Sequence, residues 1–137
     1  MLRELRGPDE DARDSDRVQP RAYRPAPGQL EFARSDARKA LQTALHARDD
    51  LTIAVVLQHF ALIEALAGET RTAARLRGYV DGRYEELGYR RGTTEEGGYQ
   101  RLIETLQRRL SVAEIVALAA QGAAWSELRA ILETTHG

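Results

Sequence analysis

Cysteine is absent from the 137 residues of this chain, so the protein can form neither a disulfide framework nor a thiolate-bound zinc site. Charge of one sign is also lacking, because 20 lysines and arginines face 21 aspartates and glutamates, for a net charge of -1. Nucleic-acid-binding chains usually carry a basic excess, which this one does not. No apolar run has the length of a membrane span or of a secretory leader, so we expect a cytoplasmic protein.

Proline is missing after residue 27. All four prolines lie in the first 28 residues, together with the charged run DEDARDSD. Apolar side chains are sparse there, so the segment cannot bury enough surface to offset the entropy lost on ordering. We therefore predict that residues 1–28 form a disordered tail or linker, with the alternative that they fold on a partner. Residues 29–137 are expected to form one helical domain.

A helix pair organises the rest of the chain. Residues 51–67 are apolar in nearly every direction of a helical wheel, which predicts a helix buried on more than one side. Asp49 and Asp50 stand where an N-terminal cap is needed, and Gly68 stands where a helix end favours glycine. Residues 70–87 carry apolar side chains at steps of three and four, which indicates an amphipathic helix with one core face.

Four further helices are predicted from apolar periodicity and capping residues, over about residues 30–48, 94–110, 112–121 and 126–134. Ser111 with Glu114 forms a capping box before one helix, which Gly122 is expected to end. Ser126 can cap the last helix. The apolar residues expected to face inward from that helix are Leu128, Ile131 and Leu132. No segment has the pattern of a strand, so the predicted fold is all-α.

Small and apolar residues recur at fixed offsets around Gly68. They are Leu57, Phe60 and Ala61 in the first helix and Ala73 and Val80 in the second. This pattern resembles a tetratricopeptide repeat. Glu64 and Arg77 depart from it, because an aromatic and a large apolar residue are usual at those two positions. The resemblance implies a short right-handed helical-repeat fragment, an α-solenoid, with a C-terminal helical cap.

A second set of motifs runs towards the C-terminal end of the sequence. It consists of Leu87-Gly88-Tyr89, Thr94-Glu95-Glu96-Gly97-Gly98-Tyr99 and Gln121-Gly122-Ala123-Ala124-Trp125-Ser126. From Ala73 to Ala130 the chain thereby resembles the C-terminal end of large bacterial ATP-binding regulators of transcription and signalling. Those proteins join a P-loop ATPase module to a tetratricopeptide-like region. The sequence has no G-x-x-x-x-G-K-[ST] motif, so the resemblance implies a regulatory, protein-interaction module without the ATPase.

No set of side chains has the spacing of a catalytic or metal site. The three histidines, His46, His59 and His136, offer no pair four residues apart on a helix. His59 could act as a ligand, a base or a pH switch, but a core histidine is the expectation. We therefore predict no enzyme activity, no cofactor and no metal.

Two groups of residues are candidates for an interaction surface. Arg71 and Arg75 can form a basic ridge with Arg77, either for an acidic partner or for neighbouring acids of the chain. Tyrosines gather around the break after residue 87, where they would line a binding groove or simply pack the loop on its flanking helices. The tyrosines in question are Tyr79, Tyr84, Tyr89 and Tyr99.

The N-terminal edge of the repeat is a third candidate. Only one helix is expected before residues 51–67, so some apolar residues of that segment should remain exposed. These residues are Ile53, Val56, Phe60 and Ile63. An exposed apolar patch usually marks an interface, which predicts a protein partner or a homodimer through this edge.

Residues 111–135 also permit an alternative, a small helix-turn-helix module that binds DNA. The second helix of such a motif must carry side chains that contact bases and phosphates. Here it offers Arg129 between Glu127 and Glu133, so nucleic-acid binding is not the favoured interpretation.

Overall fold

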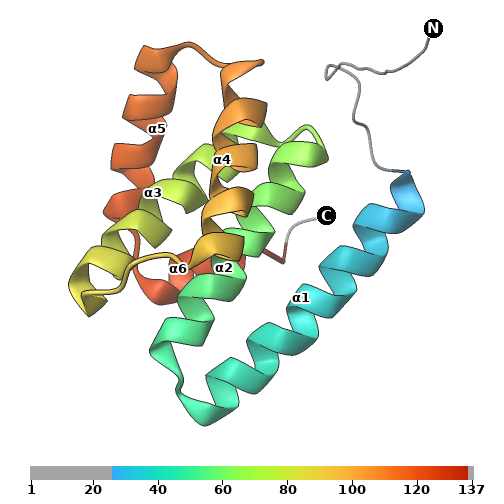
Figure 1. The fold of residues 1–137 in the computed structure, drawn as a ribbon, viewed down its shortest axis with the longest axis vertical. Coiled ribbons are helices and arrows are strands. Elements are labelled where there is room, and N and C mark those ends of the chain that lie inside the picture. Colours follow the sequence, from blue (N-terminus) through green and yellow to red (C-terminus); the bar gives the residue numbers. More distant parts are fainter. Residues whose placement is uncertain (1–25, 136–137) are drawn as a thin grey trace, which may run out of the picture.

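The chain folds as a set of packed helices in a computed structural model that describes residues 26–135 (Figure 1). This described part contains six helices and no strand, which confirms the all-α expectation. The helices are α1 (Pro27–Ala47), α2 (Asp50–Leu66), α3 (Thr70–Leu87), α4 (Thr93–Gln107), α5 (Val112–Ala123) and α6 (Glu127–Glu133). Within these residues, no helix combines the length and the apolarity that crossing a membrane requires.

Helix α1 begins earlier than the sequence indicates. It starts at Pro27, so residues 27 and 28 are helical although they were expected in the tail. A proline at the first helical position costs little, since its missing N–H would have had no partner in the first turn. The remainder of the predicted tail, residues 1–25, lies outside the described residues.

Side-chain caps fix several helix ends where they were predicted. The Asp49 carboxylate accepts the backbone N–H of Thr52 at 3.1 Å and so caps α2. Ser111 and Glu114 form a reciprocal capping box at α5, with N···O distances of 3.1 and 2.9 Å. Gly68 has a φ of 96°, a left-handed conformation that glycine adopts without strain. These local signals set the short connections that hold neighbouring helices close together.

Helices α2 and α3 form the centre of the molecule, and the other helices pack around them. Helices α1 and α4 pack on α2, whereas α5 packs on α3. In Figure 1, α1 and α5 therefore lie on opposite sides of the central pair. Most of the largest fully buried apolar side chains come from α2 to α5: Phe60, Leu57, Leu76, Val80, Leu102, Leu106 and Leu118.

The N-terminal edge is not open, which corrects the expectation of an exposed patch. All four of its apolar residues are buried: Ile53, Val56, Phe60 and Ile63. The reason is that α2 is covered by three helices, α1, α3 and α4. Helix α1 alone has 21 residues and contributes Ala37, Leu41 and Ala44 to the core. The expectation of a homodimer through these four side chains therefore loses its basis, because they are already covered.

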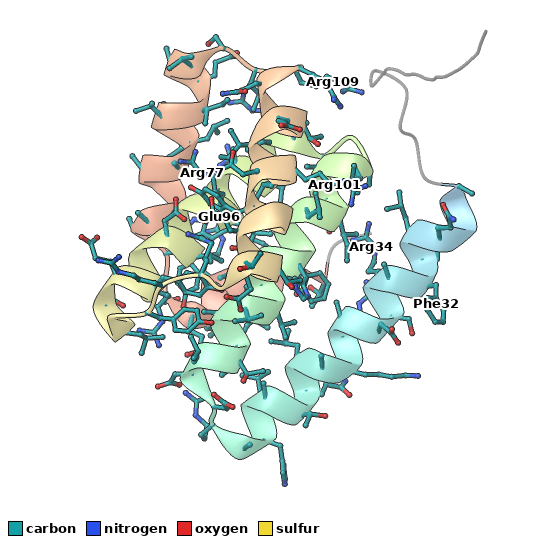
Figure 2. All side chains as sticks on the ribbon, in the orientation of Figure 1. Phe32, Arg34, Arg77, Glu96, Arg101 and Arg109 are labelled. Atoms are coloured by element: carbon teal, nitrogen blue, oxygen red, sulfur yellow. The ribbon has the colours of Figure 1, made fainter. Side chains whose placement is uncertain are left out.

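Helix α1 is also held to α2 by a buried ion pair. The Arg34 guanidinium donates to the Glu64 carboxylate, and both side chains are almost fully buried. In Figure 2, Arg34 points from α1 towards α2, whereas Phe32 projects away from the molecule and is 70% exposed. Glu64, which departs from the repeat pattern, thus has a structural role as the counter-charge for Arg34.

Helices α3 and α5 approach each other so closely that only glycine fits at two positions. A Cβ atom at Gly122 would lie 1.7 Å from the carbonyl oxygen of Arg75. A Cβ atom at Gly78 would lie 2.0 Å from the carbonyl oxygen of Ala119. The prediction that Gly122 ends a helix is therefore wrong. It lies inside α5, which continues to Ala123.

Helix α6 is short and buries little of its apolar surface. Ser126 caps it as predicted, accepting the backbone N–H of Arg129 at 3.1 Å. Leu128 and Leu132 are 66% and 50% exposed, so the expectation that they face inward is wrong. The buried residue of α6 is Ala130, and Ile131 packs against the core while partly buried.

Candidate functional site

The tyrosines near the α3–α4 connection serve mainly to pack it. The Arg91 guanidinium lies 3.8 Å from the ring centroid of Tyr99 and 4.5 Å from that of Tyr84. It also donates to Gln58 at 2.6 Å and to Asp81 at 2.8 Å. The Tyr89 hydroxyl donates to Glu95 at 2.9 Å. The polar groups of Arg91 and Tyr89 are thus bonded to other side chains of the fold, as expected if the cluster packs this connection.

Two of the predicted ridge arginines have partners within the chain. Arg75 donates to Gln121 on α5 at 2.8 Å, and Arg77 donates to the Tyr99 hydroxyl at 3.2 Å. Arg71 is exposed and only 3.9 Å from a Glu114 oxygen. The ridge therefore connects α3 to its neighbours.

His59 is on the surface and not in the core, contrary to expectation. It lies at the rim of an apolar depression between α1 and α2. In residues 26–135, no three histidine, aspartate or glutamate side chains converge in the way that a metal site requires.

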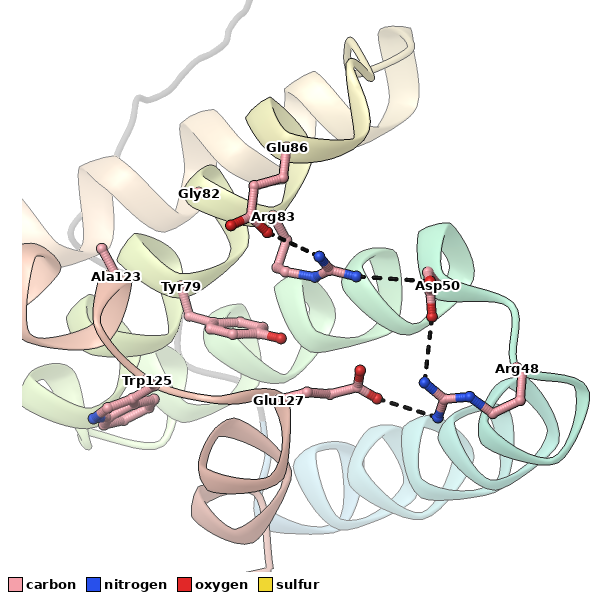
Figure 3. A pocket seen from close by; sticks show the side chains of 9 residues that line it. All are labelled: Arg48, Asp50, Tyr79, Gly82, Arg83, Glu86, Ala123, Trp125 and Glu127. Atoms are coloured by element: carbon pink, nitrogen blue, oxygen red, sulfur yellow. Dashed lines mark hydrogen bonds and ion pairs between the residues drawn. The ribbon is translucent and has the colours of Figure 1, made fainter.

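One predicted residue, Tyr79, does line a distinct cavity, which we call the charged hollow (Figure 3). Its volume is about 280 Å³, and it lies where the α1–α2 turn, α3 and the α5–α6 turn meet. The lining residues are Arg48, Asp50, Tyr79, Gly82, Arg83, Glu86, Ala123, Trp125 and Glu127. They come from three stretches that are far apart in the sequence.

The charged side chains of the hollow form a loose ring of ion pairs. Arg48 lies 3.5 Å from Asp50 and 3.4 Å from Glu127. Arg83 lies 2.8 Å from Glu86 but 3.9 Å from Asp50. Three carboxylates thus face two guanidinium groups, which gives the ring one surplus negative charge. Only one pair is at the distance of a strong charge-assisted hydrogen bond, so Asp50 and Glu127 retain capacity to accept further hydrogen bonds.

Tyr79 points from α3 into this ring. Its side chain is only 5% exposed. In Figure 3 its hydroxyl points into the space between Asp50 and Glu127. The hydroxyl makes no hydrogen bond to any residue in the described part of the chain. Burial raises the pKa of the Tyr79 phenol, an effect that Arg83 opposes and Glu127 reinforces, so at neutral pH the group is an uncharged donor and acceptor.

Arg48 occupies its place in the hollow at a conformational cost. Its φ is 53°, which makes it the one non-glycine residue with positive φ among residues 26–135. A left-handed conformation costs a residue with a side chain about 1–2 kcal/mol, and such strain is found preferentially at functional sites. A glycine would cap α1 more cheaply but would remove one guanidinium from the ring.

An apolar groove adjoins the charged hollow. It lies between the end of α1 and α6 and has a volume of about 430 Å³. Leu45, Leu128 and Ile131 line it, and Arg48 and Glu127 are shared with the hollow. A charged cavity and an apolar groove therefore form one continuous surface, which we call the hollow–groove surface.

Sequence reasoning found Tyr79 but not the rest of this surface. Arg48, Asp50 and Glu127 stand at helix ends, where charged residues are expected for capping alone. No signal in the sequence pointed to this surface, because Leu128 was expected to face the core. Comparison of the chain with known protein families, with characterised proteins and with solved structures finds no match.

Proposed function

We propose that this chain is a non-catalytic module that binds another protein in the cytoplasm and thereby regulates it. The observation that carries the proposal is the hollow–groove surface. Exposed aliphatic side chains on α6 lie beside a cavity with unused hydrogen-bonding capacity. Protein interfaces commonly combine an apolar centre with polar groups around it. The homodimer through the N-terminal edge has lost its basis and is not part of this proposal.

The setting is suggested by the sequence resemblance to the C-terminal end of bacterial ATP-binding regulators. Its motifs supply structural features of this fold, such as the left-handed Gly88 at the end of α3, whose φ is 67°. A tetratricopeptide-like arrangement also fits the way α4 packs on α2 while α5 packs on α3. Within that setting, the chain would bind a partner protein and regulate it through that binding.

The alternative is a helix-turn-helix module that binds DNA through α6. Helices α5 and α6 are joined by the short segment 124–126, as such a motif requires. However, α6 has seven residues, and its one arginine, Arg129, donates to Glu133 at 2.9 Å. Glu127 adds a further negative charge to the same helix. Phosphate binding depends on basic side chains, so we favour the protein partner.

The test is a selection of random peptides by phage display on the immobilised chain. Peptides that use the groove should lose at least about tenfold in affinity for a Leu128→Glu variant, because a charge would then occupy the apolar centre. The matched control is Val116→Glu on α5, where the replaced side chain is 63% exposed, close to the 66% of Leu128.

Two results would contradict the proposal. One is that no peptide is enriched on the chain. The other is that enriched peptides bind the Leu128→Glu variant as well as the original chain, or are lost on Val116→Glu instead.

A further inference from the structure

We propose that the charged hollow receives an arginine side chain of the partner protein, whose guanidinium would bind between Asp50 and Glu127 and donate to the Tyr79 hydroxyl. This inference rests on the proposed function and names the chemistry of the partner segment. The neighbouring residues of that segment would then place aliphatic side chains on the groove formed by Leu45, Leu128 and Ile131.

The charge of the ring favours a cation. Asp50, Glu86 and Glu127 carry three negative charges against the two positive charges of Arg48 and Arg83. One further positive charge would make the ring neutral. The arginines are 3.4–3.9 Å from Asp50 and Glu127, so the oxygens of these two carboxylates are incompletely used and can accept donors from a third group.

Tyr79 gives a second observation that fits a cationic donor in the hollow. The residue as a whole is only 5% exposed, but its hydroxyl oxygen, unlike that of Tyr84, is open to the hollow. The Tyr79 hydroxyl has no hydrogen-bond partner among residues 26–135 and points into the hollow, where it can accept a donor from a ligand (Figure 3). A guanidinium has five N–H donors in a planar fork, enough to reach both carboxylates and this hydroxyl together.

The size of the hollow also fits one side chain. Pockets for drug-sized ligands have volumes of about 300–1,000 Å³, and the hollow, at about 280 Å³, is just below that range. An anion such as phosphate would fit the volume too. It would have to displace carboxylates from Arg48 and Arg83, however, and would increase the negative charge of the ring.

The experiment titrates the full chain with ethylguanidinium and follows the NMR signals of the Tyr79 ring and the Trp125 indole. We expect both to shift in a saturable manner. Tyr79→Phe and Glu127→Gln should each weaken binding about fivefold to tenfold, the size typical of a lost hydrogen bond to a charged group. Tyr79→Phe keeps the buried ring, so it tests the hydroxyl without opening a cavity. Glu104→Gln on α4, which removes the same charge outside the hollow, should have no effect.

Three results would overturn the inference. They are an absence of shifts at Tyr79 and Trp125, equal affinities for the original chain and both hollow variants, and larger shifts with inorganic phosphate than with ethylguanidinium. Ethylammonium serves as a second probe, and it should bind more weakly because it has three donors and no planar fork. Equal or tighter binding of ethylammonium would assign the hollow to lysine and contradict the choice of arginine.

The same variants separate this inference from the proposed function. If selected peptides depend on Leu128 but lack arginine and bind Tyr79→Phe and Glu127→Gln normally, the chain binds proteins and the hollow does not receive arginine. If no peptide is selected, the proposed function fails, while the ethylguanidinium titration still reports on the hollow itself.

Discussion

Replacing Gly122 by alanine should destabilise the protein, although alanine is the better helix former. The added Cβ would lie 1.7 Å from the Arg75 carbonyl oxygen, half of the 3.4 Å at which ordinary contact begins. The obstacle is backbone and not a flexible side chain, so the crowding can be relieved only by moving α5 away from α3. That movement would also loosen the contact between α5 and α3 and the packing of Leu118, an almost fully buried residue of α5.

The magnitude follows from two opposing contributions. Overpacking of a close contact costs about 1–3 kcal/mol, with larger values where the backbone must shift. Alanine regains about 1 kcal/mol of helix propensity relative to glycine. Because the obstacle is backbone, we take the upper end of the overpacking cost, about 3 kcal/mol, and expect Gly122→Ala to lower the free energy of unfolding by about 2 kcal/mol.

Urea denaturation followed by circular dichroism is a suitable assay, since the slope of each transition also reveals whether the unfolded surface has changed. Gly82→Ala is the matched control. Gly82 lies on α3 one turn from Gly78 and has open space around the added methyl group. This control should gain about 0.5–1 kcal/mol. The reasoning is refuted if Gly122→Ala is as stable as the original chain or gains stability as Gly82→Ala does.

The double variant gives a second, independent measurement. Gly78→Ala meets the Ala119 carbonyl oxygen at 2.0 Å, across the same contact between α3 and α5. One displacement of α5 would relieve both clashes, so the two losses should not add. We expect the loss of stability in the double variant to be about 1 kcal/mol smaller than the sum of the two single losses.

Three further predictions concern other interactions. Glu64→Gln should lower the free energy of unfolding by about 3–5 kcal/mol, because it leaves the buried charge of Arg34 without a counter-charge. Arg34→Met combined with Glu64→Leu should leave the free energy of unfolding nearly unchanged. Thermal unfolding distinguishes the two outcomes. Ser111→Ala should cost about 1 kcal/mol by removing the α5 cap, measured by urea denaturation. Burial raises the pKa of Tyr84 above its ordinary 10.0, and Glu95 adds to the effect. The folded protein therefore favours the protonated phenol, and this contribution to stability is complete below pH 10.0 and is lost as the pH rises further. Tyr84→Phe should reduce the alkaline loss, measured as unfolding midpoints over a series of pH values.

The helices were predictable because their signals are local. Asp49, Ser111 and Ser126 mark helix starts through side-chain oxygens that accept nearby backbone N–H groups, and each does so in the structure. The apolar run in α2 predicted burial on several sides, which is what three neighbouring helices provide. Patterns of this kind depend on residues within one or two turns of one another.

The errors arose where a distant segment decides the role of a residue. Gly122 has the same sequence signature whether it ends a helix or admits a neighbouring backbone, and only the position of Arg75 distinguishes the two. Leu128 and Leu132 have the spacing of core residues, yet both are exposed because no other helix in residues 26–135 covers that side of the short α6. The charged hollow combines residues from three separate connections and helices, so no spacing in the sequence predicts it.

The position of Arg91 makes two consecutive arginines unequal towards a protease. Trypsin must draw an arginine side chain into its own specificity pocket. Arg90 is exposed, whereas Arg91 is held by Gln58 and Asp81 and stacked on two tyrosine rings. Cleavage in the α3–α4 connection would therefore follow Arg90. Arg91 would then remain on the α4 fragment, still bonded to Gln58 on α2 and Asp81 on α3, so the nicked protein would stay assembled.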